Sequence, residues 1–94
     1  MEDLDNSIFV GDKSFMNYVT AVVMQFTTKG AQEVFVKSRG KFISKAVDVA
    51  EVSVKRFLKD QIKIDDISID SETFTNKEGR EVRVSVMEIR LKKV

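Results

Sequence analysis

The stretch KSRGKFISKAVD, residues 37–48, joins the end of one expected strand to the start of one expected helix. The preceding residues 33–38 are rich in Val and Phe, which favours a β-strand. From about residue 44 to residue 57, apolar residues recur at the spacing of one helix face. They are Ala46, Val47, Ala50, Val54 and Phe57. With Gly40 in the connecting turn, the stretch predicts a strand, a tight turn and a helix.

The segment before this unit repeats the same order. Residues 7–10 form a short apolar run that stops at Gly11, which predicts a first strand. Ser14 is suited to cap a helix through its hydroxyl. The following apolar residues have helical spacing and predict a helix over residues 15–27. They are Phe15, Val19, Val22, Val23 and Phe26.

The C-terminal third alternates between apolar and polar residues, as β-strands do. Residues 62–74 alternate with a phase slip at Asp65-Asp66, which predicts a β-bulge. Residues 75–80 form a hairpin loop, and residues 82–91 form the last strand. The chain is therefore expected to be an α/β protein. Its predicted form is a two-layer α+β sandwich of order βαβαββ, with two helices and a four-stranded mixed sheet. One domain is expected over residues 1–94, with residues 1–6 as a disordered tail.

Composition excludes several kinds of protein. Of 94 residues, 43% are hydrophobic, which is enough for a folded domain. The chain has no cysteine and no histidine, so thiolate metal sites and the commonest general base are excluded. No catalytic constellation is visible, so we expect no enzyme and no cofactor. The acidic group Asp65, Asp66, Asp70 and Glu72 alternates between sheet faces and is not expected to bind a metal. The short acidic N-terminus is unlike a signal peptide, so a cytoplasmic location is expected.

Charge is concentrated although the net charge is only +1. Lys37, Arg39, Lys41 and Lys45 lie within nine positions that contain no acid. Such a cluster suits the phosphate groups of a polyanion, although an ordinary solvated surface would look the same. If the first two strands run parallel, Lys13 joins the cluster at one sheet edge. The hairpin adds Lys77, Arg80 and Arg83, whose arginines have Glu78 and Glu81 as alternative partners.

Four motifs, in order along the chain, carry a resemblance to a known family. They are GDKSFMNYV at residues 11–19, KSRGK leading into ISKAVD at residues 37–48, RFL at residues 56–58, and Gly79-Arg80 leading into Val84-Ser85 and Met87-Glu88-Ile89. With the expected order of elements, they resemble the Alba family of archaeal chromatin proteins over nearly the whole chain, from about residue 8 to residue 94.

The resemblance implies a fold like the C-terminal domain of bacterial translation initiation factor three. It also implies a chromosome-associated homodimer that condenses DNA, and often binds RNA, with little sequence preference. The expected nucleic-acid contacts are Lys13, Asn17, Arg39, Lys41, Lys45, Lys77, Arg80 and Arg83. Asn17 is included because it belongs to the first motif, and local capping is its alternative role. The expected contacts within or between dimers are Val49 and Val52, which lie off the core stripe, and Phe57.

The first loop departs from the family pattern. Relatives usually carry two lysines and a proline after the glycine, whereas this chain has Asp12, Lys13 and Ser14. A lysine-modifying enzyme, which the family implies, would have only Lys13 as its target in this loop. The lost cation and gained anion are expected to lower DNA affinity. Two other functions stay open: an RNA-binding module of an RNA-metabolism or ribonuclease P-like complex, and a protein-interaction adaptor whose basic face is incidental.

Overall fold

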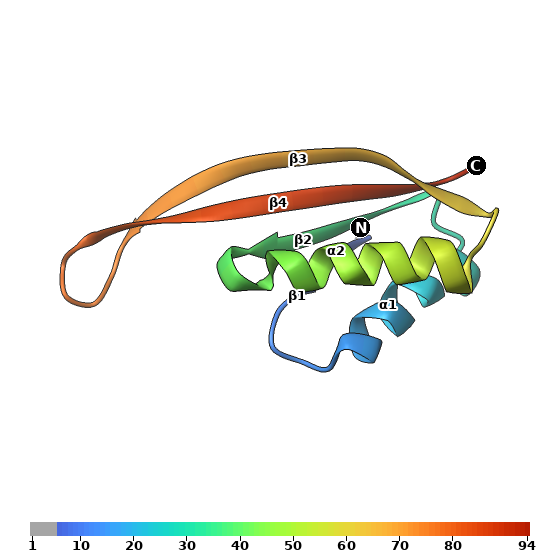
Figure 1. Ribbon diagram of the computed structural model, residues 1–94, viewed down its shortest axis with the longest axis horizontal. Coiled ribbons are helices and arrows are strands. Elements are labelled where there is room, and N and C mark those ends of the chain that lie inside the picture. The colour runs from blue at the N-terminus through green and yellow to red at the C-terminus, as the bar shows by residue number, and fades with distance from the viewer. Residues whose placement is uncertain (1–5) are drawn as a thin grey trace.

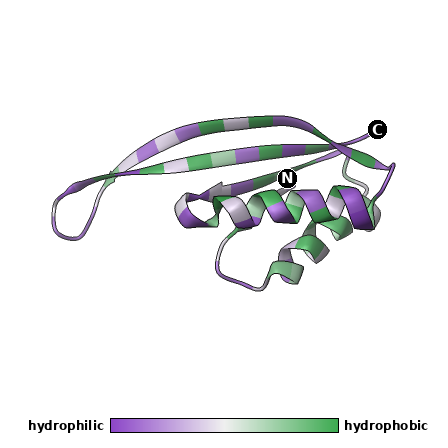
Figure 2. Cartoon of the chain, viewed as in Figure 1, coloured by the Kyte–Doolittle hydropathy of each residue, from purple (hydrophilic) through white to green (hydrophobic). Residues whose placement is uncertain are grey.

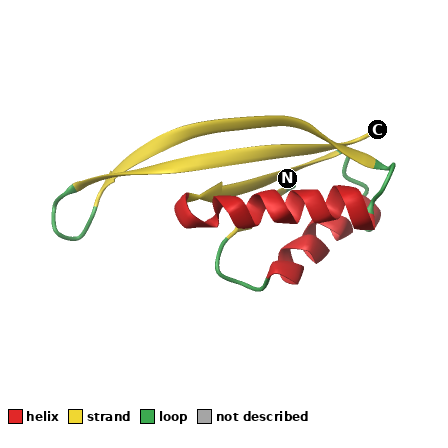
Figure 3. Ribbon diagram, viewed as in Figure 1, coloured by secondary structure: helices red, strands yellow, loops and turns green. Residues whose placement is uncertain are grey.

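The computed structural model describes residues 6–94, in which two helices cover one face of a four-stranded sheet (Figures 1 and 3). The strands are β1 (Ser7–Val10), β2 (Glu33–Arg39), β3 (Ile62–Thr75) and β4 (Glu81–Lys93). The helices are α1 (Phe15–Thr27) and α2 (Ile43–Val52), the latter preceded by the 3-10 turn η1 (Gly40–Phe42) and followed by the π-helical turn η2 (Ser53–Phe57). The predicted α+β sandwich of order βαβαββ is confirmed.

The sheet has the order β1-β2-β4-β3. β1 and β2 are parallel, whereas β4 pairs antiparallel with both β2 and β3, so the sheet is mixed as predicted. The register of β3 against β4 shifts between Ile64 and Asp66, which confirms the predicted bulge. The bulged residue Asp65 accepts a 2.8 Å hydrogen bond from Nε of Arg90 on β4.

The core lies between the sheet and the helices, where alternate strand residues meet the apolar faces of α1 and α2 (Figure 2). Among the most buried members are Val34 and Val36 of β2, Ile89 and Leu91 of β4, Val19 and Val22 of α1, and Ala46 and Val49 of α2. Each buried side chain of this size contributes roughly 1.5–3 kcal/mol through the hydrophobic effect. Alternation in β2 and β4 therefore assigns one sheet face to the core.

The buried face of α2 differs from the predicted stripe. Val49 is fully buried, whereas Val47 and Phe57 are 40% and 49% exposed. After Val52 the chain widens into a π-helical turn, in which the amide of Leu58 donates to the carbonyl of Ser53. A helical period of 3.6 residues no longer applies there, so Phe57 turns away from the core. The prediction of Val49 as a dimer contact is wrong, because Val49 is enclosed within the subunit.

The N-terminal boundary also differs from the prediction. Asn6 was expected in the disordered tail, but its side-chain amide donates to the carbonyl of Glu33 at 2.6 Å. Its own carbonyl accepts a hydrogen bond from the amide of Phe35. Asn6 is therefore anchored to β2, while residues 1–5 of the predicted tail lie outside the described residues.

The β3–β4 hairpin projects beyond the helices and gives the molecule its elongated shape, 47 × 29 × 23 Å (Figure 1). Its loop is closed by Asn76, whose side-chain oxygen accepts hydrogen bonds from the amides of Glu78 and Arg80 at 3.0 Å. Gly79 has a φ of 79°, which favours glycine. The hairpin is thus an ordered arm. Within residues 6–94 neither helix has the length and apolar content needed to cross a membrane.

Candidate functional site

The β1–α1 loop and the η1 turn lie at the same end of the sheet, and the hairpin projects from that end (Figure 1). This follows from the parallel pairing of β1 and β2, whose carboxyl ends share one sheet edge. The structure thus brings together the two loops that carry Lys13 and Lys41, as the sequence predicted. Both residues are exposed.

The β1–α1 loop is held in place by two side chains. The buried hydroxyl of Tyr18 accepts hydrogen bonds from the amides of Gly11 and Lys13 at 2.9 and 3.1 Å. The ammonium of Lys45 donates to the carbonyl of Gly11 at 2.8 Å and to the carbonyl of Lys13. It also lies 5.3 Å from the centre of the Tyr18 ring. Two of the three N–H groups of Lys45 therefore fix the loop, which makes it first of all a positioning residue.

The N-terminal cap of α1 differs from the prediction. Ser14 occupies the cap position of α1, but its hydroxyl makes no capping bond. Its carbonyl accepts the amide of Asn17 at 3.1 Å instead. The side chain of Asn17 is exposed in the first turn of α1, beside the loop that carries Lys13.

The η1 turn depends on Gly40. Its φ is 53°, and a Cβ built there would lie 3.2 Å from a methyl group of Val84 on β4. A glycine therefore lets the turn approach the hairpin closely. The turn is flanked by Arg39 and Lys41, both exposed.

A surface groove beside η1 is lined by several of the residues that were predicted to contact nucleic acid. Arg39, Lys41 and Arg83 of β2, η1 and β4 all contribute to its lining, with Arg39 on the sheet face away from the helices and Arg83 on the helix side. Lys77 and Arg80 do not join this group, because they lie in the hairpin loop at the far end of the arm (Figure 1). Within residues 6–94 neither Arg80 nor Arg83 forms an ion pair, so the alternative pairing with Glu78 and Glu81 is not observed.

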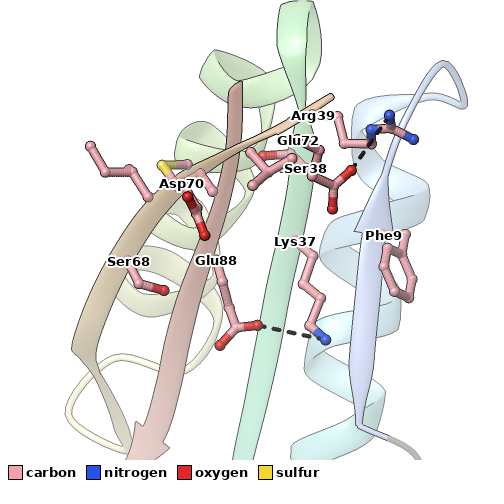
Figure 4. A pocket seen from close by; sticks show the side chains of 11 residues that line it. Phe9, Lys37, Ser38, Arg39, Ser68, Asp70, Glu72 and Glu88 are labelled. Carbon is pink, nitrogen blue, oxygen red and sulfur yellow. Dashed lines mark ion pairs between the residues drawn. The ribbon is translucent and has the colours of Figure 1, made fainter. Parts of the chain in front are cut away.

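Arg39 has an acidic neighbour that the sequence did not reveal. Its guanidinium lies 3.6 Å from a carboxylate oxygen of Glu72 on β3, and both side chains are 58% exposed. An ion pair this exposed contributes about 0–1 kcal/mol, so a phosphate can replace the carboxylate. Lys37 forms a similar pair with Glu88 of β4, also at 3.6 Å (Figure 4).

These two pairs belong to the sheet surface that carries no helices, which we call the open face. The strand register assigns the following side chains to it: Phe9, Phe35, Lys37, Arg39, Ser68, Asp70, Glu72, Phe74, Val82, Val84, Val86 and Glu88. Figure 4 shows Phe9, Lys37, Arg39, Glu72 and Glu88 directed to this side. Sequence reasoning missed the phenylalanines of this face, although their alternation with buried valines in β1 and β2 was a usable signal.

The acidic residues are dispersed as separate side chains. Among residues 6–94, no three of them gather closely enough to hold a metal ion. The carboxylate of Asp65 forms an ion pair with Arg90 at the base of the hairpin. The arrangement at the loop end is therefore a cationic surface suited to binding anions.

Comparison with known proteins identifies relatives over nearly the whole chain. The Alba family model matches residues 6–71. The DNA/RNA-binding protein Alba of Methanothrix thermoacetophila is 53% identical over 89 residues, which cover 95% of this chain and 97% of that protein. The protein of the same name from Methanococcus maripaludis is 47% identical over 86 residues, covering 92% and 96%.

A solved structure gives the same result. Alba from Thermoplasma volcanium superposes with a TM-score of 0.84 at 48% identity, covering 93% of this chain and 99% of that one. These similarities confirm the resemblance that the four sequence motifs indicated.

Proposed function

Since the chain belongs to the Alba family, we propose that it is an architectural protein that binds duplex DNA, and also RNA, through backbone phosphates as a homodimer. The relatives from Methanococcus maripaludis and Methanothrix thermoacetophila are named DNA/RNA-binding proteins. The observation that carries the proposal is that three cations, Arg39, Lys41 and Arg83, line one groove beside the loop of Lys13. In this proposal residues 1–94 act as one domain that is associated with the chromosome.

Phosphate contacts are divided between the loop end and the arm. Lys13, Lys41 and Arg83 are exposed and form no ion pair within residues 6–94, so their charges are available to phosphates. Arg39 joins them by exchanging Glu72 for a phosphate. Lys77 and Arg80 at the arm tip reach a separate stretch of the backbone. Contacts of this type position a duplex without reading its sequence.

Homodimerisation is supported by apolar side chains left uncovered at the β3 edge of the molecule. Ile67 and Ile69 of β3 are 54% and 78% exposed, and Ile69 lines a hollow together with Ile43 at the start of α2. Val47 and Phe57 add exposed apolar surface on the α2 side. We propose that a second copy covers these residues, with Val52 and Phe57 retained from the predicted contacts. Ile69→Glu should then convert dimers into monomers in sedimentation-velocity experiments.

Lys13 is also the proposed target of a lysine-modifying enzyme. Its side chain is exposed while its backbone is held by Tyr18 and Lys45. Neutralising it by acetylation would remove one cation from a fixed position beside the groove, and duplex affinity should fall modestly.

Salt-dependent binding tests the proposal directly. A dimer that engages about six phosphates should show a slope near −5 in log affinity against log salt on duplex DNA. The double variant Arg39→Glu with Lys41→Glu should lose most of that affinity and flatten the slope. The control is Lys29→Glu with Lys59→Glu, which makes the same charge change at exposed positions beyond the far ends of α1 and α2.

Two results would overturn the proposal. Equal losses in the two double variants would show that only net charge matters. No retardation of any nucleic acid at low salt would instead favour the protein-interaction adaptor. Competition between duplex DNA and structured RNA of matched length would rank the two ligands.

A further inference from the structure

The open face carries exposed aromatic rings where a solvated sheet face normally carries polar side chains. Phe9 in β1 is 68% exposed, and Phe74 in β3 is 45% exposed. Both line the groove that also contains Arg39 and Lys41. Exposed apolar side chains that are grouped on one face often mark a binding surface, whereas single scattered ones do not.

Cations lie beside these rings. Nζ of Lys37 is 5.5 Å from the centre of the Phe9 ring and 6.0 Å from that of Phe35. Cζ of Arg39 is 5.7 Å from the centre of the Phe74 ring. The register explains the first contact, because Phe9 and Lys37 are direct neighbours on β1 and β2 (Figure 4). A ring with a neighbouring cation offers a stacking surface for a base and a partner for its phosphate.

The acids on the same face distinguish between kinds of nucleic acid. Glu88 and Glu72 lie 3.6 Å from Lys37 and Arg39, respectively, and they repel the dense phosphates of a duplex. A carboxylate does, however, accept hydrogen bonds from the amino groups of bases. Those amino groups are free on unpaired bases and occupied within a duplex. The mixture of rings, cations and acids therefore suits a single strand.

We propose that the open face binds unpaired bases of a single-stranded nucleic acid, with Phe9 and Phe74 as stacking surfaces and Lys37 and Arg39 as phosphate partners. This inference rests on the proposed function, since it gives the same protein a second, strand-selective surface. The face continues into the cationic groove at Lys41, so one strand can run from the loop end across the sheet.

Phe9 provides the test because its exposure lets it be replaced without opening the core. Binding is measured by fluorescence anisotropy with a short labelled RNA that cannot pair with itself, with DNA of the same sequence, and with the corresponding DNA duplex. Loss of one stacked base corresponds to roughly 1–3 kcal/mol, so Phe9→Ala should weaken single-strand binding about 5- to 150-fold. Duplex affinity should fall much less, because the proposed duplex contacts are made by cations to phosphates and do not use the Phe9 ring.

Two further variants separate stacking from general apolar contact. Phe9→Leu keeps an apolar side chain without a ring and should behave like Phe9→Ala. Phe9→Trp enlarges the ring and should preserve single-strand affinity. The RNA and DNA strands distinguish the two sources of unpaired bases, and either one binding with this pattern supports the proposal.

The outcomes also separate this inference from the proposed function. Single-strand affinity that is unchanged in Phe9→Ala, or reduced equally for strand and duplex, overturns the inference. If duplex binding still depends on Arg39 and Lys41 in that case, the proposed function stands alone. Phe9-dependent binding of single strands without any duplex binding would leave the inference standing and reject the duplex proposal.

Discussion

The two faces of the sheet are built from the same strands, yet they differ in almost every property. On the covered face, Val34, Val36 and Leu91 are fully buried against the helices. On the open face, one residue away along β2, Lys37 and Arg39 are paired with acids and lie beside phenylalanine rings. Strand alternation thus separates the residues that stabilise the fold from those that are free to bind. Variants on the two faces should therefore have separable effects.

The largest effect is expected from a matched pair of truncations on the two faces. Leu91→Ala removes a side chain with no exposed surface and should lower the free energy of unfolding by about 2–5 kcal/mol. Phe9→Ala removes a larger side chain but should cost less than about 1 kcal/mol, because 68% of it is already exposed. Urea denaturation followed by circular dichroism, at equal protein concentration, compares the two. Similar costs would contradict the division between the faces.

An intermediate effect is expected at Lys45, whose ammonium donates hydrogen bonds to backbone carbonyls of the first loop. Lys45→Met removes its hydrogen bonds to the carbonyls of Gly11 and Lys13 and should destabilise the protein by about 1–2 kcal/mol. Amide exchange at Gly11 and Lys13 should accelerate. The matched control is Lys55→Met, which breaks only the exposed pair with Glu51 at 3.7 Å and should cost under about 0.5 kcal/mol. Unchanged amide exchange in the loop of the Lys45→Met variant would contradict the positioning role of Lys45.

A smaller effect, an increase in the free energy of unfolding, is expected at a buried position in the helical layer. The hydroxyl of Ser53 is fully buried and has no hydrogen-bond partner within residues 6–94. Ser53→Ala removes this group, so the free energy of unfolding should rise by about 1 kcal/mol. A higher urea midpoint with an unchanged slope would support this. A lower midpoint would mean that the hydroxyl is needed by the π-helical turn.

The smallest effect is expected at Asp12, which is exposed beside Lys13 in the first loop. Asp12→Lys replaces an anion by a cation near the groove and should tighten duplex binding by at most about 1 kcal/mol per subunit. The gain should vanish at high salt, because screening weakens exposed charges. Anisotropy titrations at low and high salt measure it. Weaker binding at low salt would show that the loop does not face the duplex.

Much of the fold could be predicted because the patterns are local. Val34 and Val36 alternate strictly, and the shift from Ile62 and Ile64 to Ile67 and Ile69 reveals the bulge. The end of α2 could not be predicted, because nothing in residues 53–57 signals a wider helical turn. Phe57 was therefore assigned to the core stripe and is in fact half exposed.

The candidate site could be predicted only in part. The common sheet edge of the loops that carry Lys13 and Lys41 follows from the parallel pairing of β1 and β2, so this part of the geometry could be predicted. The role of Lys45 depends on a contact between residues 34 positions apart, which sequence spacing does not show. The open-face rings were missed, although in β1 and β2 phenylalanines alternate with apolar core residues and the sequence therefore carried a signal.

The bulge at Asp65 has a consequence for how this protein can diverge. The extra residue shifts the alternation of side chains in the outer part of β3 by one position. Ile67 and Ile69 therefore stay on the helix side of the sheet, and Phe74 lies on the open face. Deleting Asp65 would restore a regular ladder, because Ile64 and Asp66 already pair with adjacent residues of β4, and both faces of the arm would keep their side chains. A residue inserted elsewhere in the outer strand, with no bulge to absorb it, would instead exchange the two faces, so Asp65 marks the position at which this strand tolerates a change in length.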